Sequence, residues 1–577
     1  EALAPGQFTL IARTQRRGGE RLSVEIPVTV NTPAVARVEL GELGGAIYSG
    51  TARTLPAVVY DVNGDERPEI LVSWSSSAPR VASFDSFGNL RLHAPGSFTA
   101  VAAVEGQSSS TTLQVLANPL ASIDLTLDRD SVRTGDVVHV TAIGRDAAGA
   151  SIDDVPLLLS FTATPDDQLG QPASGQITQD GRFVAETPGI YTIVATSGAA
   201  SNRVSLRADA RDVGMQLELI GRGEVYDVHT SDLWVWEGVD GGDYAVTGTW
   251  VANGDAIFWD VTDPADIKRI ASITVDARTV NDVKVSEDGR ICVISREGAS
   301  DRKNGIVIID VSNPRDPQQL STFDENLTCG VHNVFIEGHH VFALSAGRRY
   351  DVIDIEDPLQ PHAVGTFELG TSGHSIHDVW VEDGIAYSSN WRDGLQIVDV
   401  GNGVAGGSPS NPVWMAAYAY PSGRNHAAFP YRDQETGRFY VVAGDEAFPY
   451  GLHVTGSPTY PRGWLHFVDF TDMENPEEVA RYQVPEAGSH NLWIEGDVLY
   501  AAFYNGGVRV VDISGELLGD LYRQGREIAF YLPTSPEGFV ANAPMVWGPQ
   551  PYKGHIYFAD WNTGLWAMKL APKKRRR

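Results

Sequence analysis

The chain has little cysteine and no long apolar run, and both absences exclude whole classes of protein. Only two of its 577 residues are cysteine, which excludes a disulfide-dense scaffold and a cysteine-rich metal module. No run approaches the roughly 18 apolar residues that a membrane helix needs. Signature motifs are missing too, since no G-x-S-x-G elbow, P-loop, H-E-x-x-H or dinucleotide fingerprint occurs in a supporting context. The sequence therefore offers no motif that would indicate a hydrolase or a nucleotide-dependent enzyme.

Basic residues are also scarce. The 74 Asp and Glu residues outnumber the 44 Lys and Arg residues, which gives a formal net charge of −30. Such a surface repels the phosphates of nucleic acids and anionic lipids. Hydrophobic residues make up 42% of the chain, which argues against wholesale disorder. Glycine (59) and proline (32) are abundant, and their number predicts a turn-rich, all-β protein. The length of 577 residues predicts several domains, since a single core stops growing at roughly 250 to 300 residues.

The first third contains a divergent repeat that begins at a Pro-Gly turn. The turn occurs three times, at Pro5-Gly6, Pro95-Gly96 and Pro188-Gly189. Each copy continues as two strands of alternating apolar residues, which predicts the closing hairpin of a half-buried β-sandwich. In the middle copy further alternating segments precede the turn, with Trp74 available for a core. This arrangement resembles bacterial Ig-like domains of surface proteins, and it implies such domains at residues 33–117 and 118–210.

Residues 1–32 contain only the closing hairpin of such a domain. We interpret them as the end of an Ig-like domain that begins upstream, in a longer precursor, where a signal peptide is also expected. The alternative is strand donation, in which the incomplete sheet pairs with a neighbouring copy of the chain through its open edge.

A second repeat begins at about residue 212. An apolar strand ends in an aspartate followed by a turn at six positions, and a seventh copy has a lysine there: Asp260, Asp310, Asp354, Asp399, Asp469, Asp512 and Lys569. Intervals run from 43 residues (Asp469 to Asp512) to 70 residues (Asp399 to Asp469), around the roughly 40 to 50 residues of a four-stranded propeller blade. Each aspartate is expected to accept hydrogen bonds from its turn. The repeat predicts a seven-bladed β-propeller over residues 211–570.

Closure of this ring is predicted from one unassigned strand. The last blade supplies three strands of its own, while Met215 to Ile220 precedes the first blade. Because a closed ring leaves no exposed edge, we expect this segment to complete the last blade.

The phrases IVIIDVSNP, GLQIVDV and GVRVVDIS resemble LVIVD-repeat propellers of secreted and surface proteins. The segments around HNV, HDVW and SHNLWIEG are similar to the related bacterial choice-of-anchor B proteins. Together these resemblances cover about residues 212–570. They imply an extracytoplasmic location and say little about chemistry, because propellers host many functions.

Histidines recur at one position of the predicted inner strands. Alignment places His332, His377, His426 and His490 in register in four consecutive blades, with Tyr226, Asn281 and Pro544 in the other three. Inner strands converge on the propeller axis, so imidazoles from several blades can meet one metal ion at roughly 2.0–2.2 Å. The sequence predicts one transition metal (Fe, Cu or Zn), similar in principle to the four-histidine iron of carotenoid-cleaving propellers. The alternative is a structural polar network.

Other side chains are candidates to support these imidazoles or to bind a partner. Asp445, Glu446, Tyr226 and Asn281 are expected to orient the histidines from behind. Cys292 and Cys329 are expected to form a disulfide, or to be two free thiols, or to include a thiolate ligand. The loop from Glu446 to Gly463 carries Phe448, Tyr450 and Tyr460, which we interpret as a partner-binding surface or as a lid on its own blade. Residues 571–577 form a basic C-terminal tail, which contacts acidic neighbours or is simply solvated.

The sequence therefore predicts a secreted or cell-surface protein, without a nucleic-acid partner or a transmembrane segment. Its Ig-like stalk presents the propeller as a non-enzymatic platform for protein or carbohydrate partners. The first alternative is a metal-dependent propeller oxidoreductase that uses the four histidines. The second is a subunit of a self-associating extracellular assembly or filament, which the incomplete first domain and the basic tail would suit.

Overall fold

The computed structural model describes residues 6–15, 21–85, 87–166, 173–211, 214–327, 329–420, 422–448, 463–485 and 487–573. Over these residues the chain is built of β-strands joined by turns, and it contains no helix there. Consequently no helix in the described part is long and apolar enough to cross a membrane. The predicted all-β class is confirmed.

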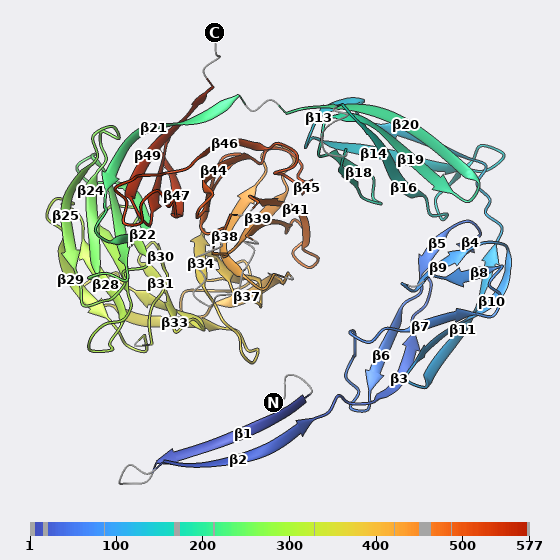
Figure 1. The fold of residues 1–577 in the computed structure, drawn as a ribbon, viewed down its shortest axis with the longest axis horizontal. Coiled ribbons are helices and arrows are strands. Elements are labelled where there is room, and N and C mark those ends of the chain that lie inside the picture. The colour runs from blue at the N-terminus through green and yellow to red at the C-terminus, as the bar shows by residue number, and fades with distance from the viewer. Residues whose placement is uncertain are drawn as a thin grey trace.

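The first described element is an isolated hairpin. β1 (Gly6–Gln15) and β2 (Arg21–Val30) pair in antiparallel register, with Gly6 opposite Val30. Within the described ranges no third strand joins this sheet. Phe8, Leu10, Val24 and Ile26 are therefore between 48% and 60% exposed. The hairpin predicted for residues 1–32 is present, and Figure 1 shows it separate from the sheets that follow.

Three small sheets follow in residues 35–116. Their strand orders are β4-β11-β10-β7, β5-β9-β8 and β3-β6. Phe98 and Val115 are fully buried in their core, and Trp74 is half-buried and stacks on Phe84 with ring centroids 4.8 Å apart. The strands are β3 (Val35–Leu40), β4 (Ile47–Tyr48), β5 (Ala52–Thr54), β6 (Ala57–Asp61), β7 (Ser73–Ser76), β8 (Ala82–Phe84), β9 (Asn89–Leu92), β10 (Gly96–Val104) and β11 (Gln107–Leu116).

Two sheets with one shared core occupy residues 122–209. One has the order β12-β14-β18-β17 with β15 on β14, and the other has the order β13-β20-β19-β16. Val138, Phe183, Tyr191 and Leu206 from both sheets lie in the core. The strands are β12 (Ser122–Leu127), β13 (Ser131–Arg133), β14 (Val137–Arg145), β15 (Ser151–Ile152), β16 (Leu158–Pro165), β17 (Gly175–Ile177), β18 (Arg182–Ala185), β19 (Gly189–Ser197) and β20 (Ala200–Asp209).

The predicted hairpins after the Pro-Gly turns are confirmed in both regions. β10 pairs with β11, and β19 pairs with β20, in antiparallel register. Buried and half-buried residues alternate along β10 and β19, as the apolar alternation in the sequence predicts.

From residue 229 onward, runs of consecutive strands form separate antiparallel sheets, which we call blades. Blade one contains β22 (His229–Glu237), β23 (Asp243–Trp250), β24 (Asp255–Asp260) and β25 (Lys268–Thr274). Blade two contains β26 (Val283–Val285), β27 (Ile291–Arg296), β28 (Gly305–Asp310) and β29 (Gln318–Phe323). Blade three contains β30 (Val334–Glu337), β31 (His340–Ser345), β32 (Arg349–Asp354) and β33 (His362–Glu368).

The remaining blades continue this order. Blade four contains β34 (Asp378–Glu382), β35 (Ile385–Ser389), β36 (Leu395–Asp399) and β37 (Val413–Tyr418). Blade five contains β38 (Asn425–Arg432), β39 (Phe439–Asp445), β40 (Trp464–Asp469) and β41 (Glu477–Gln483), extended by β45 (Gly519–Asp520). Blade six contains β42 (Leu492–Glu495), β43 (Val498–Phe503), β44 (Gly507–Asp512) and β46 (Glu527–Tyr531). The closing blade contains β47 (Val546–Tyr552), β48 (His555–Asp560), β49 (Gly564–Pro572) and β21 (Met215–Glu224).

The blades form a ring. Their first strands contact one another in the order β22, β26, β30, β34, β38, β42 and β47, and β47 in turn contacts β22. Figure 1 shows these blades around a common centre, with β21 reaching the ring from the N-terminal domains. This is the arrangement of a β-propeller, in which radial repetition leaves few sheet edges exposed.

The predicted clasp strand is confirmed. β21 pairs with β49 in antiparallel register, from Met215 opposite Pro572 to Glu224 opposite Gly564. Leu217 is buried beside Trp566 and Met568. The segment before blade one therefore completes the blade that ends the chain.

The recurring aspartates form the turns that the repeat predicts. In each of the six copies one carboxylate oxygen accepts a hydrogen bond from the backbone N–H two residues later, over 2.8 to 3.2 Å. This local bond fixes the direction in which the chain leaves the third strand of each blade. These aspartates are structural, since each is used by its own turn.

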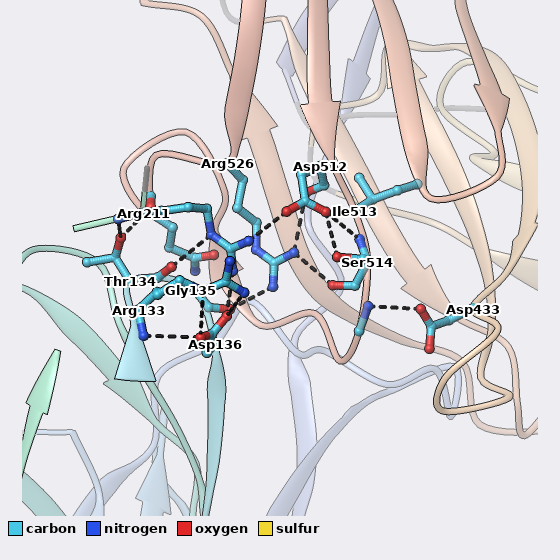
Figure 2. Close-up of polar contacts among 12 residues, drawn as sticks. Arg133, Thr134, Gly135, Asp136, Arg211, Asp433, Asp512, Ile513, Ser514 and Arg526 are labelled. Carbon is cyan, nitrogen blue, oxygen red and sulfur yellow. Dashed lines mark hydrogen bonds and ion pairs between the residues drawn. The ribbon is translucent and has the colours of Figure 1, made fainter. Parts of the chain in front are cut away.

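Residues 122–209 are attached to blade six through Arg211. One guanidinium nitrogen of Arg211 donates to Asp136 and another to Asp512, both over 2.6 Å, and Nε donates to the carbonyl of Thr134 over 3.1 Å. Figure 2 shows Arg211 between these two carboxylates, with Arg526 beside it. Because the Arg211 side chain is almost fully buried, these bonds are shielded from water.

Direct contacts between the two regions surround Arg211. Arg526 donates to the carbonyl of Gly135 over 2.6 Å (Figure 2). The Thr134 hydroxyl donates to the carbonyl of Gln524 over 2.7 Å. Val137 and Val184 pack against Leu518 of the propeller. The junction therefore combines buried charge, hydrogen bonds and a small apolar contact.

Replacement of Arg211 by methionine is expected to release this junction. Two partly buried carboxylates would lose their shared cation, and breaking a buried ion pair in this way costs roughly 3–5 kcal/mol. Small-angle X-ray scattering should show a larger radius of gyration for Arg211→Met, while the propeller melts within a few degrees of the original chain. The control is Arg207→Met, which removes an exposed arginine that pairs with Asp166 and Asp209. Identical scattering from both variants would contradict the assigned role.

Candidate functional site

The four predicted histidines lie side by side at one end of the propeller. His332, His377 and His490 come just before the first strands of blades three, four and six, and His426 lies at the start of β38. Their ring centroids are 4.8 Å apart from His332 to His377, 4.1 Å from His377 to His426, and 4.3 Å from His426 to His490. The structure therefore brings these four residues together in one row. We call the end of the propeller where they lie the histidine face.

Two tryptophans close this row into a ring of aromatic side chains. Trp547 lies 4.4 Å from His490, Trp250 lies 5.6 Å from Trp547, and Trp250 lies 6.3 Å from His332, all between ring centroids. Trp547 comes from the first strand of the closing blade, whereas Trp250 ends the second strand of blade one. The ring therefore combines side chains from two positions of the repeat, the first strand and the end of the second strand.

A second set of side chains lies on the histidine face, and of these the sequence predicted only Glu446. The residue at or just after the end of the second strand contributes a side chain beside the histidines in several blades: Trp250, Glu297, Trp391, Glu446, Tyr504 and Trp561. A signal for them exists. Trp391, Tyr504 and Trp561 each stand eight residues before the recurring Asp399, Asp512 and Lys569.

Hydrogen bonds fix the outer two imidazoles. His332 Nδ1 is 2.5 Å from a carboxylate oxygen of Glu297, and His332 Nε2 accepts from the amide of Asn281 over 3.3 Å. His490 Nδ1 is 2.5 Å from the carbonyl oxygen of Trp547. Since a carboxylate or carbonyl only accepts, each Nδ1 carries the proton. Both nitrogens of His332 are therefore occupied, while Nε2 of His490 keeps its lone pair.

The inner two imidazoles lack such partners. Neither ring nitrogen of His426 has a hydrogen-bond partner among the described residues, and neither does Nδ1 of His377. Burial lowers the pKa of both side chains well below the ordinary value, and the neighbouring histidines lower it further. Burial also lowers the pKa of His490 to about 4. These three imidazoles are therefore neutral at pH 7 and offer lone pairs.

Glu446 is the acid closest to the inner pair. One of its carboxylate oxygens lies 3.9 Å from His377 Nε2, and the other accepts a hydrogen bond from Tyr504 over 3.0 Å. Burial raises the pKa of Glu446. Among the described residues no Lys or Arg forms an ion pair with it.

The other predicted supporting residues divide into two groups. Asn281 contacts His332 and also donates to the side chain of Asn333 over 2.8 Å, as expected of a residue that orients the row. Asp445 is buried beside the imidazole of His466, 3.6 Å away, and accepts from Ser422, so it orients a different histidine. Tyr226 lies outside the row, next to Glu224 and Ser535.

The first blade explains the misplacement of Tyr226. Its inner strand is β22, which begins at His229, three residues after the aligned tyrosine. Asp232 is the true counterpart of Asp282 and Asp378, since all three line one axial cavity and the Asp232 N–H donates to the carbonyl of Asn281. Asp282 links blades two and three, because it accepts a hydrogen bond from the N–H of Val334 over 2.8 Å.

That cavity lies on the propeller axis and contains a buried lysine. Its volume is about 60 Å³, and its walls include Trp234, Trp380 and Trp493. Lys284 Nζ forms ion pairs with Asp232, over 3.0 Å, and with Asp282. Burial raises the pKa of Asp282, and burial likewise raises that of Asp378. Burial alone would lower the pKa of Lys284, but the two carboxylates outweigh it, so Lys284 remains charged.

Of the alternatives left open for the two cysteines, the structure has two free thiols and not a disulfide. Cys292 and Cys329 are both free thiols, Cys292 buried and Cys329 exposed. Cys292 pairs with Val285, near the end of the inner strand of blade two, whereas Cys329 lies at the turn before the inner strand of blade three. The two thiols therefore lie at opposite ends of neighbouring blades. Cys329 is also not among the groups whose ligand atoms converge.

The predicted partner-binding loop is described only at its two ends, at residues 446–448 and at Gly463. Phe448 is part-exposed and stacks on Tyr504, with ring centroids 5.2 Å apart. Tyr450 and Tyr460 lie outside the described residues, as do the last four residues of the basic tail.

Comparison with known proteins supports the repeat. Three segments match the LVIVD repeat, at residues 299–324, 373–419 and 488–516, which confirms that the chain contains such repeats. No curated protein matches the sequence. Similar solved structures include the β-propeller domain of Cps50 (Swd1) from Myceliophteria thermophila, at 11% identity and a TM-score of 0.40 over 60% of this chain and 97% of that one. Another is the C-terminal WD40 domain of Sif2, at 14% identity and a TM-score of 0.37 over 66% and 89% of the two chains.

Proposed function

We propose that the protein is an extracytoplasmic, multidomain binding protein. In this proposal residues 33–117 and 118–210 are Ig-like domains, and the ring of sheets is a seven-bladed propeller. The propeller presents its histidine face to a protein or carbohydrate partner. The LVIVD repeats and the propeller fold support an interaction platform, because propellers offer rigid, broad surfaces to partners.

The observation that carries the proposal is the position of the junction relative to the histidine face. The histidines stand at the start of the first strands, while Asp512 and Arg526 of the junction stand where the third strand of blade six ends and the fourth begins. Because neighbouring strands alternate in direction, these positions lie at opposite ends of the propeller. The N-terminal domains therefore attach without covering the histidine face.

Exposed apolar side chains surround this free face. Val251 follows Trp250, and Phe448 stacks on Tyr504. Phe539 packs at a tilt against His229, which itself stacks on Trp561. Phe539 is 48% exposed although it belongs to this aromatic cluster. Aromatic groups of this kind supply large contact areas to proteins and to sugar rings.

Binding of the partner should depend on the exposed apolar side chains around the histidine face. The full chain is screened against a glycan array and a panel of extracellular proteins, and the affinity of each identified ligand is then measured with Phe539→Ser. We expect a loss of at least about tenfold, since interface aromatics often contribute more than 1 kcal/mol. Phe530→Ser is the matched control, because Phe530 is 51% exposed on the outer strand of blade six. Equal affinities of the two variants, or an absence of ligands in both screens, would contradict the proposal.

A further inference from the structure

We propose that His377, His426 and Glu446 bind one divalent transition-metal ion on the histidine face. The inference is independent of the partner proposed above, because it concerns a bound ion rather than a docking surface. It also changes the ligand set that the sequence predicts, from four histidines to two histidines and one carboxylate.

The geometry selects these three residues. They are provided by blades four and five, and each places a ligand atom within 4.8 Å of the ligand atoms of the other two. His377 Nε2 and the nearer Glu446 oxygen are 3.9 Å apart. Two ligands bound at roughly 2.0–2.2 Å can lie up to about 4 Å apart across one ion. The three side chains therefore need only small rotations to share an ion.

The hydrogen bonds around His426 leave its ring nitrogens available to a metal ion. His426 is only 1% exposed, yet both of its ring nitrogens lack a hydrogen-bond partner among the described residues. Buried polar atoms in folded proteins are normally paired, so an unpaired buried imidazole requires an explanation. A metal ion would take one lone pair of His426, and Glu446 would supply the negative charge that a divalent cation requires.

The two flanking histidines differ in whether a ring nitrogen is available to the ion. His332 is occupied at both nitrogens, by Glu297 and Asn281, which explains why it stands outside the ligand set. His490 donates from Nδ1 to the backbone carbonyl of Trp547, and its ring lies 4.3 Å from the ring of His426 between centroids. Histidine ligands usually donate their other ring N–H to a carbonyl or carboxylate in this way, so His490 is the candidate for a fourth ligand, although its ligand atoms lie outside the converging group.

The donor set defines the class of metal. Two imidazole nitrogens with one carboxylate oxygen suit divalent first-row transition metals such as Fe²⁺ and Zn²⁺, whereas Ca²⁺ and Mg²⁺ prefer oxygen alone. Two histidines and one carboxylate leave further coordination positions open. Glu446, His377 and His332 are part-exposed, so the site is accessible from the histidine face.

The test uses the full chain, stripped of metal with a chelator and then titrated with Zn²⁺ and, without oxygen, with Fe²⁺ by calorimetry. We expect about one ion per chain, and an affinity at least about tenfold weaker in His426→Ala and in Glu446→Gln. Glu446→Gln preserves shape and therefore separates metal loss from misfolding, which circular dichroism checks in every variant. His340→Ala is the matched control, because His339, His340 and Asp354 form a second, more exposed group of possible ligands.

Two results would overturn the proposal. One is an original chain that binds neither Zn²⁺ nor Fe²⁺. The other is binding that His340→Ala abolishes while His426→Ala and Glu446→Gln leave it intact, since the ion would then occupy the more exposed group.

Discussion

A chain that begins at residue 225 is expected to melt on the order of 10 °C below a chain that begins at residue 214. Both lack the N-terminal domains and the Arg211 junction, but only the longer one retains β21. The difference therefore isolates the strand that completes the closing blade. Thermal unfolding followed by circular dichroism measures it.

The expected loss has two physical sources. β21 pairs with β49 along its whole length and buries Leu217 beside Trp566 and Met568, and burying one leucine contributes roughly 1.5–3 kcal/mol. Without β21 the edge of β49 would be unpaired, and a bare edge also promotes association between copies. The shorter chain should therefore melt earlier and form larger particles in light scattering.

A pair of point variants in the full chain provides the control. Leu217 is 8% exposed, whereas Leu219 of the same strand is 44% exposed. Leu217→Asp should reproduce most of the loss, and Leu219→Asp should have little effect. Equal melting temperatures for the two truncated chains, or for the two point variants, would show that β21 does not close the ring.

Lys284→Met is expected to destabilise the propeller by roughly 3–5 kcal/mol at pH 8, the usual result of breaking a buried ion pair. The substitution leaves Asp232 and Asp282 in the axial cavity without a cation, and Asp378 also lines this cavity. Denaturant unfolding of the full chain measures the deficit relative to the original protein.

The deficit should depend on pH in a definite direction. Without Lys284 the folded-state pKa of these carboxyls would lie above their unfolded value, which is close to 4. The folded variant then binds more protons than the unfolded chain between the two values, so its stability falls as pH rises through that window. The deficit should accordingly be smaller at pH 5 than at pH 8.

Two further variants test this account. Lys268→Met removes an exposed lysine that pairs with the exposed Asp266, and it should change stability little at either pH. The double variant Lys284→Met with Asp282→Asn should recover part of the loss, because it removes one unpaired charge. A deficit that is equal at both pH values would rule out buried carboxylates as its cause.

Local signals made most of the fold predictable. The recurring aspartates form hydrogen bonds over two residues, so their spacing alone locates the third strand of six blades. The Pro-Gly hairpins are equally local. The inner strand of blade one was misplaced because the segment VYDV resembles its counterparts, whereas its real position depends on the bond from Asp232 to Asn281 in the next blade.

The site was predictable only where residues share one position of the repeat. The histidines satisfy this condition, whereas Glu297 and Tyr504 belong to a different position, at the end of the second strand. The sequence left the state of the two cysteines open because separation along the chain does not indicate which end of a blade a residue occupies. Arg211 was not predictable at all, since its two acidic partners, Asp136 and Asp512, are 75 and 301 residues away.

The path from Arg211 into β21 also determines how the molecule responds to tension. A force that pulls the N-terminal domains away from the propeller would first load the bonds of Arg211 to Asp136 and Asp512. Once these break, the load passes to the Met215 end of β21, which lies opposite Pro572 near the end of the chain. A force applied at Met215 would separate the hydrogen-bonded pairs of β21 and β49 one after another from that end, instead of loading all of the pairs at once. The bonds of Arg211 would therefore break before the strand that closes the ring begins to separate.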